Sequence, residues 1–163
     1  MLSTLELIIR LSVAAVFGAV LGWEREAQNK PAGLRTHILV SLGSAAFMLA
    51  GLELNNELVA KGQSNSADIL KVVGGIVGGI GFLGAGSIIQ NRRGVSGLTT
   101  AATIWVAAAV GITSGLGYYR LAAISVVLAL SALLALGTLQ HGKKYLKADD
   151  QPEVEDDAHK DDH

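Results

Sequence analysis

The sequence lacks cysteine and has little charge. None of its 163 residues is cysteine, which excludes a disulfide framework and a cysteine-ligated zinc site. Only 17% of the residues are charged, whereas half are hydrophobic, and the mean hydropathy is +0.44. A soluble domain of this size is far less apolar. The composition therefore indicates an integral, all-α membrane protein.

The sequence also lacks the usual signs of an enzyme. It has no nucleophile–base pair, metal cluster or phosphate loop in a suitable context. Gly79–Gly84 matches the G-x-G-x-x-G dinucleotide pattern, but that pattern requires an acidic residue about 20 positions later, and Thr99–Val110 contains none. We therefore expect no catalytic activity, cofactor, bound metal or nucleic-acid partner.

Charge is distributed unevenly along the chain. The formal net charge is -1, but Ala148–His163 carries eight acids and one lysine, whereas Met1–Lys147 carries twelve Lys/Arg and six acids. The acidic segment has almost no apolar residues with which to bury a core. We predict a transmembrane domain over 1–147 and a disordered acidic cytoplasmic tail over 148–163.

Seven glycines lie within the apolar stretch Val72–Gly86. Glycine costs about 1 kcal/mol per interior helical position relative to alanine, but a segment in lipid stays helical because an unpaired backbone group costs more there. The spacing gives small-xxx-small pairs, which allow close approach of a neighbouring helix. We predict that Gly74, Gly75, Gly78 and Gly79 are helix-packing positions; the alternative is a glycine-rich break in the helix that lines a polar cavity. Gly18/Gly22 and Gly111/Gly115 repeat the same spacing.

Five apolar runs approach the roughly 20 residues that a spanning helix requires. The predicted spans are 5–23, 36–52, 69–89, 97–114 and 121–139. We expect Thr36 to be the N-cap of the second and shortest span. The polar stretch Glu53–Asp68 is either a solvated loop or a short helix along the membrane surface. Glu6 and Arg10, four residues apart near the start of the first span, can form an ion pair or extend their charged ends to the membrane surface.

The distribution of Lys and Arg predicts the orientation. With the N-terminus outside, eight Lys/Arg lie on the cytoplasmic side and four lie outside, which the positive-inside rule favours. This N-out, C-in topology brings three connections together on the cytoplasmic side. Their polar residues form a candidate functional cluster of Glu24, Arg25, Glu26, Arg35, Thr36, His37, Thr99 and Thr100. The alternative is that these residues only set the topology and cap helices.

Four motifs occur in the order found in a known family. They are GWERE at Gly22–Glu26, KPAGLRTH at Lys30–His37, GIGFLGAG at Gly79–Gly86 and VSGLTTAATIW at Val95–Trp105. With these motifs the chain resembles the MgtC/SapB family of bacterial inner-membrane proteins, in a short form without the C-terminal cytoplasmic domain of many members. Some members have Asn at the position of Thr99, an acid at that of Asn91 and Cys at that of Val106.

The resemblance implies five transmembrane helices with a cytoplasmic C-terminus, in agreement with the charge count. It also implies a role in growth at low magnesium, intracellular survival or acid stress. Two functions remain open: a regulatory protein, or an oligomeric transporter or channel for Mg²⁺ or another small ion. The implied partners besides the lipid bilayer are a second copy of the chain or another membrane protein, such as the ATP synthase.

Overall fold

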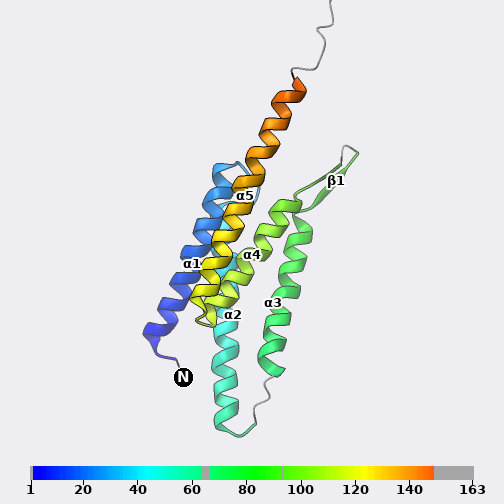
Figure 1. Cartoon of the computed structure of the whole chain (residues 1–163). Helices are drawn as coiled ribbons and strands as arrows, with labels where there is room; N and C mark the ends of the chain where they lie inside the picture. The colour runs from blue at the N-terminus through cyan, green and yellow to red at the C-terminus, as the bar shows by residue number, and fades with distance from the viewer. Residues whose placement is uncertain (1, 64–66, 93, 149–163) are drawn as a thin grey trace, which may run out of the picture. The chain divides into compact units, whose positions relative to one another are not determined.

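The computed structural model describes residues 2–63, 67–92 and 94–148 (Figure 1). It divides into two compact units, Met1–Leu130 and Ser131–His163, of which the first contains the packed bundle. The elements are α1 (Thr4–Ala27), α2 (Leu34–Ala60), α3 (Ala67–Gly86), β1 (Ile89–Asn91), β2 (Gly94–Ser96), α4 (Leu98–Gly115) and α5 (Tyr119–Ala148). The all-helical prediction is confirmed apart from one short hairpin. The predicted tail lies outside the described residues, except for Ala148.

Four of the helices, α1 to α4, are long and apolar enough to cross a membrane. The described apolar part of α5, Tyr119–Ala135, is shorter, so the fifth span stays a prediction. Spanning helices place the chain in a lipid bilayer, where every backbone polar group must be paired within the protein.

The second span differs from its prediction at both ends. Gly33, not Thr36, is the N-cap of α2, and the helix has 27 residues, so both the predicted cap and the predicted shortest span are wrong. Residues 53–60 continue the helix and form neither a loop nor a separate surface helix. The helix ends where Gly62 adopts a φ of +70°, a backbone conformation that glycine adopts without strain.

Glycine pairs on α1 and α4 hold α2 between these two helices. A Cβ at Gly18 would lie 2.6 Å from the His37 carbonyl oxygen, and one at Gly111 would lie 2.2 Å from the Ser41 carbonyl oxygen. Gly22 and Gly115 also approach the α2 backbone closely. These two small-xxx-small pairs therefore act in packing as their spacing predicts.

The glycines of α3 have different surroundings. A Cβ at Gly74, Gly75, Gly78 or Gly79 would meet no atom within 4 Å in the described part of the chain. The packing of these four glycines against a helix therefore stays a prediction, and that helix would belong to another molecule. Within the chain, α3 packs mainly on α4, where Gly84 faces Ala101.

The core of the bundle is centred on α4, the most buried of the four long helices. Leu21 of α1, Ala107 and Val110 of α4, and Ala122 and Val126 of α5 form one buried cluster. A tight β-hairpin links α3 to α4, with Asn91 opposite Gly94.

Gly97 connects this hairpin to α4. Its φ is +86°, and a Cβ there would lie 1.9 Å from the Ser87 carbonyl oxygen. Only glycine satisfies both conditions.

Candidate functional site

One end of the bundle carries the candidate cluster. The C-terminal end of α1, the start of α2, the hairpin after α3 and the start of α4 all lie there, as Figure 1 shows. The convergence expected from the topology therefore occurs in the structure. Burial, however, divides the predicted residues into an inner and an outer group: Glu24, Arg25, His37 and Thr100 are buried, Thr36 is half-buried, and Glu26, Arg35 and Thr99 are exposed.

Glu24 and Arg25 form a buried ion pair in the last turns of α1. The Arg25 Nη2 donates to Glu24 Oε1 at 2.7 Å, and Arg25 Nε donates to Glu24 Oε2. Only 9% of Glu24 and 4% of Arg25 are exposed. Such a two-bond fork satisfies both charges locally, and a charge this buried requires a partner.

Glu26 stabilises the start of α2. Its Oε2 accepts a hydrogen bond from the Leu34 backbone N–H at 2.8 Å. The N-cap Gly33 has no side chain for this purpose, so a carboxylate from the preceding helix satisfies one of the free N–H groups and faces the positive end of the helix dipole. Glu26 therefore has the capping role that the sequence assigned to Thr36.

His37 lies completely buried between α1 and α2. Its Nδ1 is 2.9 Å from the Gly33 carbonyl oxygen. That contact requires a proton on Nδ1, which leaves Nε2 of the neutral ring as an acceptor. Nε2 is buried and has no hydrogen-bond partner among the described residues. Gly22 makes room for the first side-chain carbon of His37, since a Cβ on Gly22 would lie 3.0 Å from the His37 Cβ.

Hydroxyl groups continue the buried polar region into the bundle. The Thr103 Oγ1 donates to the Thr100 carbonyl oxygen at 2.9 Å, and the Ser41 Oγ donates to the Ala14 carbonyl oxygen at 2.8 Å. Ser44 and Ser114 are also buried. These buried serines were not predicted. The sequence pattern that could have indicated them is the helical spacing of small polar residues on α2 and α4.

Three residues of the outer group, Glu26, Arg35 and Thr36, border a shallow pocket of about 300 Å³, whereas Thr99 does not line it. Glu26, Lys30, Arg35 and Thr36 contribute its polar side chains. Lys30 and Arg35 outnumber the single Glu26 carboxylate, so the charge of this pocket is net positive. Its chemistry suits a phosphate or carboxylate group better than a metal ion.

The opposite end of the bundle contains an arginine outside the predicted cluster. Arg10 Nη1 donates to the Gly115 carbonyl oxygen at 2.8 Å, and Nη2 donates to Glu6 Oε1 at 3.0 Å. Of the two predicted alternatives, the ion pair is the one that the structure shows, and Arg10 also caps the C-terminus of α4. A Cβ on Gly117 would lie 3.3 Å from the guanidinium carbon. Arg10 therefore ties α1 to the connection between α4 and α5.

Neither end provides a metal centre within the residues that the structure describes. In the described ranges, no group of three or more His, Asp or Glu side chains is close enough to hold an ion. The candidate site therefore offers a paired carboxylate, an imidazole acceptor, buried hydroxyls and two outer cations. These groups can bind or sense a polar partner.

Comparison with known proteins gives consistent results. A family model described as the MgtC family matches residues 11–141. Protein SrpB of Synechococcus elongatus is 41% identical over 147 residues, covering 83% of this chain and 78% of SrpB. No solved structure matches the chain.

Two further relatives are longer than the region they share with this chain. The Escherichia coli K12 protein named "Putative magnesium transporter YhiD" is 40% identical over 130 residues, covering 80% of this chain and 60% of YhiD. Protein MgtC of Salmonella typhimurium LT2 is 36% identical over 129 residues, covering 79% of this chain and 52% of MgtC. The chain thus spans little more than half the length of these relatives.

Proposed function

The chain belongs to the MgtC family, and from this membership we propose that it is a regulatory, non-enzymatic protein of the bacterial inner membrane. In this role it supports adaptation to low magnesium, acid or a related ionic stress. The observation that carries the proposal is the polar cluster at one end of the bundle, with an exposed cationic pocket above buried polar groups. Such a surface suits a polar partner at the membrane face.

The orientation in this proposal is N-out and C-in, so the cluster faces the cytoplasm. The Lys/Arg distribution supports it. Because the chain has no cysteine, Gln63→Cys and Val95→Cys each provide a single label at an exposed position at opposite ends of the bundle. An impermeant thiol reagent should label Gln63→Cys in intact spheroplasts and spare Val95→Cys, and the reverse pattern would refute this orientation.

Transport of Mg²⁺ or another small ion is the second candidate function, favoured by the name of YhiD. Mg²⁺ sites use carboxylates together with retained waters. Among the described residues, Glu24 is the only buried carboxylate, and Arg25 already neutralises it. A cation path through the bundle would be expected to carry free carboxylates. The regulatory function, exerted on a second copy or on a membrane-protein partner such as the ATP synthase, therefore fits better.

Arg35 is the residue best suited to test whether the polar cluster is needed for function. It is exposed and forms no ion pair with the described residues, so we expect its removal to leave the fold intact. In a strain that lacks the gene and grows poorly in low magnesium, we expect the native gene to restore growth and Arg35→Ala to give growth no better than the empty vector. Lys61→Ala, an exposed cation at the opposite end, is the matched control and should restore growth.

Membrane abundance of each variant is measured by immunoblot, because loss of growth means nothing if the protein is degraded. Full restoration by Arg35→Ala at normal abundance would show that the charges at this end only set the topology.

A further inference from the structure

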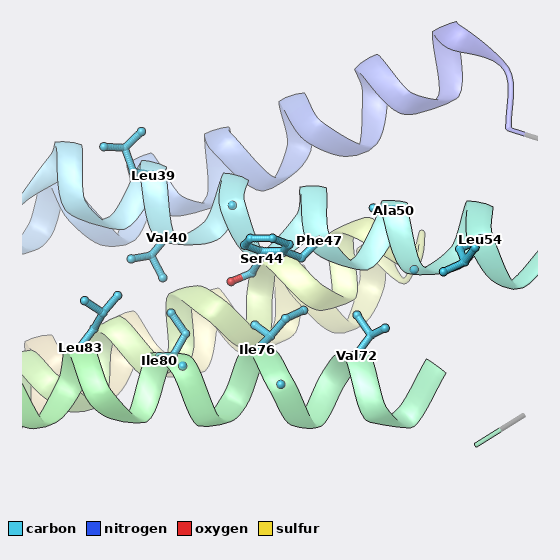
Figure 2. A pocket seen from close by; sticks show the side chains of 14 residues that line it. Leu39, Val40, Ser44, Phe47, Ala50, Leu54, Val72, Ile76, Ile80 and Leu83 are labelled. Carbon is cyan, nitrogen blue, oxygen red and sulfur yellow. The ribbon is translucent and has the colours of Figure 1, made fainter. Parts of the chain in front are cut away.

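An apolar groove lies between α2 and α3. It has a volume of about 800 Å³, and Figure 2 shows Val40 and Phe47 of α2 and Ile76, Ile80 and Leu83 of α3 along its walls. Ser44 supplies its only polar side chain among the described residues. The lining of the groove is therefore apolar and matches hydrocarbon better than water or ions.

Glycines give the groove its depth. Gly43 and Gly51 of α2 and Gly75 and Gly79 of α3 line it, and a Cβ at Gly43, Gly75 or Gly79 would meet no atom within 4 Å. These positions leave space that the described part of the chain does not fill. An unfilled apolar space in lipid forfeits the dispersion contacts that hold membrane helices together, so an apolar occupant is favoured.

Positive charge lies at one end of this groove. Arg35 precedes the lining residue Leu39 by one helical turn, so the two lie on the same face of α2. Arg35 and Lys30 border the shallow pocket at the start of α2, and Arg92 is exposed on the hairpin after α3. An occupant with an anionic head and an apolar tail matches this arrangement in both charge and polarity.

We propose that the groove between α2 and α3 binds one anionic phospholipid of the surrounding bilayer, with an acyl chain along Gly75 and Gly79 and the phosphate at Arg35 and Lys30. Basic pockets at the ends of transmembrane helices bind anionic headgroups in this way. From Leu39 to Leu54 the groove runs for about 22 Å along α2, which exceeds the roughly 15 Å depth of one leaflet. An acyl chain therefore fits along its length.

A helix from a second copy fits the groove less well. A Cβ at Gly51 would lie 2.9 Å from the Val72 side chain, so α2 and α3 are in contact toward the end of the groove that is farther from Arg35. A helix is about 10 Å wide with its side chains, and its insertion would force α2 and α3 apart. A single acyl chain requires no such movement. Lipid binding in this groove does not depend on the proposed regulatory function.

Two matched double variants test the site in the full-length protein. Gly75→Leu with Gly79→Leu fills the groove, and the open space at both positions allows the bundle to fold. Gly74→Leu with Gly78→Leu makes the same change on α3 at two equally open positions outside the groove. Purified protein in detergent is heated with phosphatidylglycerol or with zwitterionic phosphatidylcholine, and its melting temperature is read by circular dichroism.

We expect phosphatidylglycerol to raise the melting temperature of the native protein and of the Gly74/Gly78 variant, and phosphatidylcholine to raise it much less. Without lipid, the groove-filled variant should have the melting temperature of the native protein. Phosphatidylglycerol should not raise the melting temperature of this variant. Arg35→Gln should raise the phosphatidylglycerol concentration needed for a given increase in melting temperature about five-fold, since one cation near an anionic lipid surface contributes about that factor to the affinity.

Three results would overturn the proposal. If the groove-filled variant keeps the lipid response of the native protein, the lipid binds elsewhere. An equal rise in the melting temperature of the native protein with both lipids would show that the negative charge of the lipid does not contribute to binding. Conversion of a native dimer to a monomer by the groove-filled variant alone, measured by light scattering, would assign the groove to a second copy.

Discussion

Replacing Gly111 with alanine should destabilise the bundle strongly, because the added methyl group meets the backbone of a neighbouring helix. Its Cβ would lie 2.2 Å from the Ser41 carbonyl oxygen and 2.8 Å from the Ser44 Cβ. The first of these atoms belongs to the backbone of α2, so the whole helix must move. Overpacking of this kind costs about 1–3 kcal/mol, and we expect a lower melting temperature and less protein in the membrane.

Gly43→Ala is the matched control for this prediction. Gly43 lies on the same helix as Ser41, but a Cβ there would meet no atom within 4 Å. Alanine favours a helix over glycine by about 1 kcal/mol, so this variant should be as stable as the native protein or more stable. Equal melting temperatures for Gly111→Ala and the native protein would mean that α2 and α4 are not packed as described.

The second large effect is expected at the buried ion pair. Glu24→Gln leaves the Arg25 guanidinium in the bundle without its carboxylate, and breaking a buried pair in this way costs about 3–5 kcal/mol. Removal of both charges in Glu24→Gln with Arg25→Met should recover much of that loss, because no unpaired charge remains. Thermal unfolding of the native protein and the two variants measures both effects.

Glu6→Gln is the control for the ion-pair prediction. Glu6 pairs with Arg10 at 3.0 Å but is 46% exposed, so water screens this pair and its loss should cost less than about 1 kcal/mol. If Glu24→Gln is no more destabilising than Glu6→Gln, the Glu24–Arg25 pair is not buried in the membrane protein. This difference also explains why Arg35, not Glu24, is the residue suited to a growth test.

The apolar runs predicted most of the fold, because a spanning helix requires a long stretch with few charges. The limits of α2 were harder to predict. The polar residues after Leu52 suggested the end of the helix, but the stretch up to Lys61 contains neither glycine nor proline, and the helix continues until Gly62 adopts a positive φ. The capping of α2 by Glu26 was also hard to predict, because Glu26 belongs to another helix, α1.

The glycine pairs show a further limit of sequence reasoning. The spacing of Gly18/Gly22 and Gly111/Gly115 is the same as that of Gly75/Gly79, yet the first two pairs contact α2 and the third borders an open groove. Spacing determines which side chains share a helix face. The helix that lies opposite that face depends on the tertiary arrangement, which the spacing does not contain.

The candidate site was predicted in its location but not in its internal organisation. The topology brought its residues to one end of the bundle, whereas burial separated Glu24, Arg25, His37 and Thr100 from the exposed Arg35 and Thr99. Adjacent residues such as Thr99 and Thr100 differ by about 100° around the helix axis. One therefore faces outward while the other is buried, and the polar pattern alone did not decide which.

Ion flux through the reconstituted protein tests the proposed regulatory function most directly. Purified protein is placed in liposomes that contain a Mg²⁺-sensitive dye, and Mg²⁺ entry is compared with entry into protein-free liposomes and into liposomes with an established Mg²⁺ transporter. We predict entry no faster than in the protein-free liposomes, because the described buried groups provide no free carboxylate for a cation. Saturable Mg²⁺ entry that increases with the amount of protein and is lost in Arg35→Ala would contradict the regulatory function.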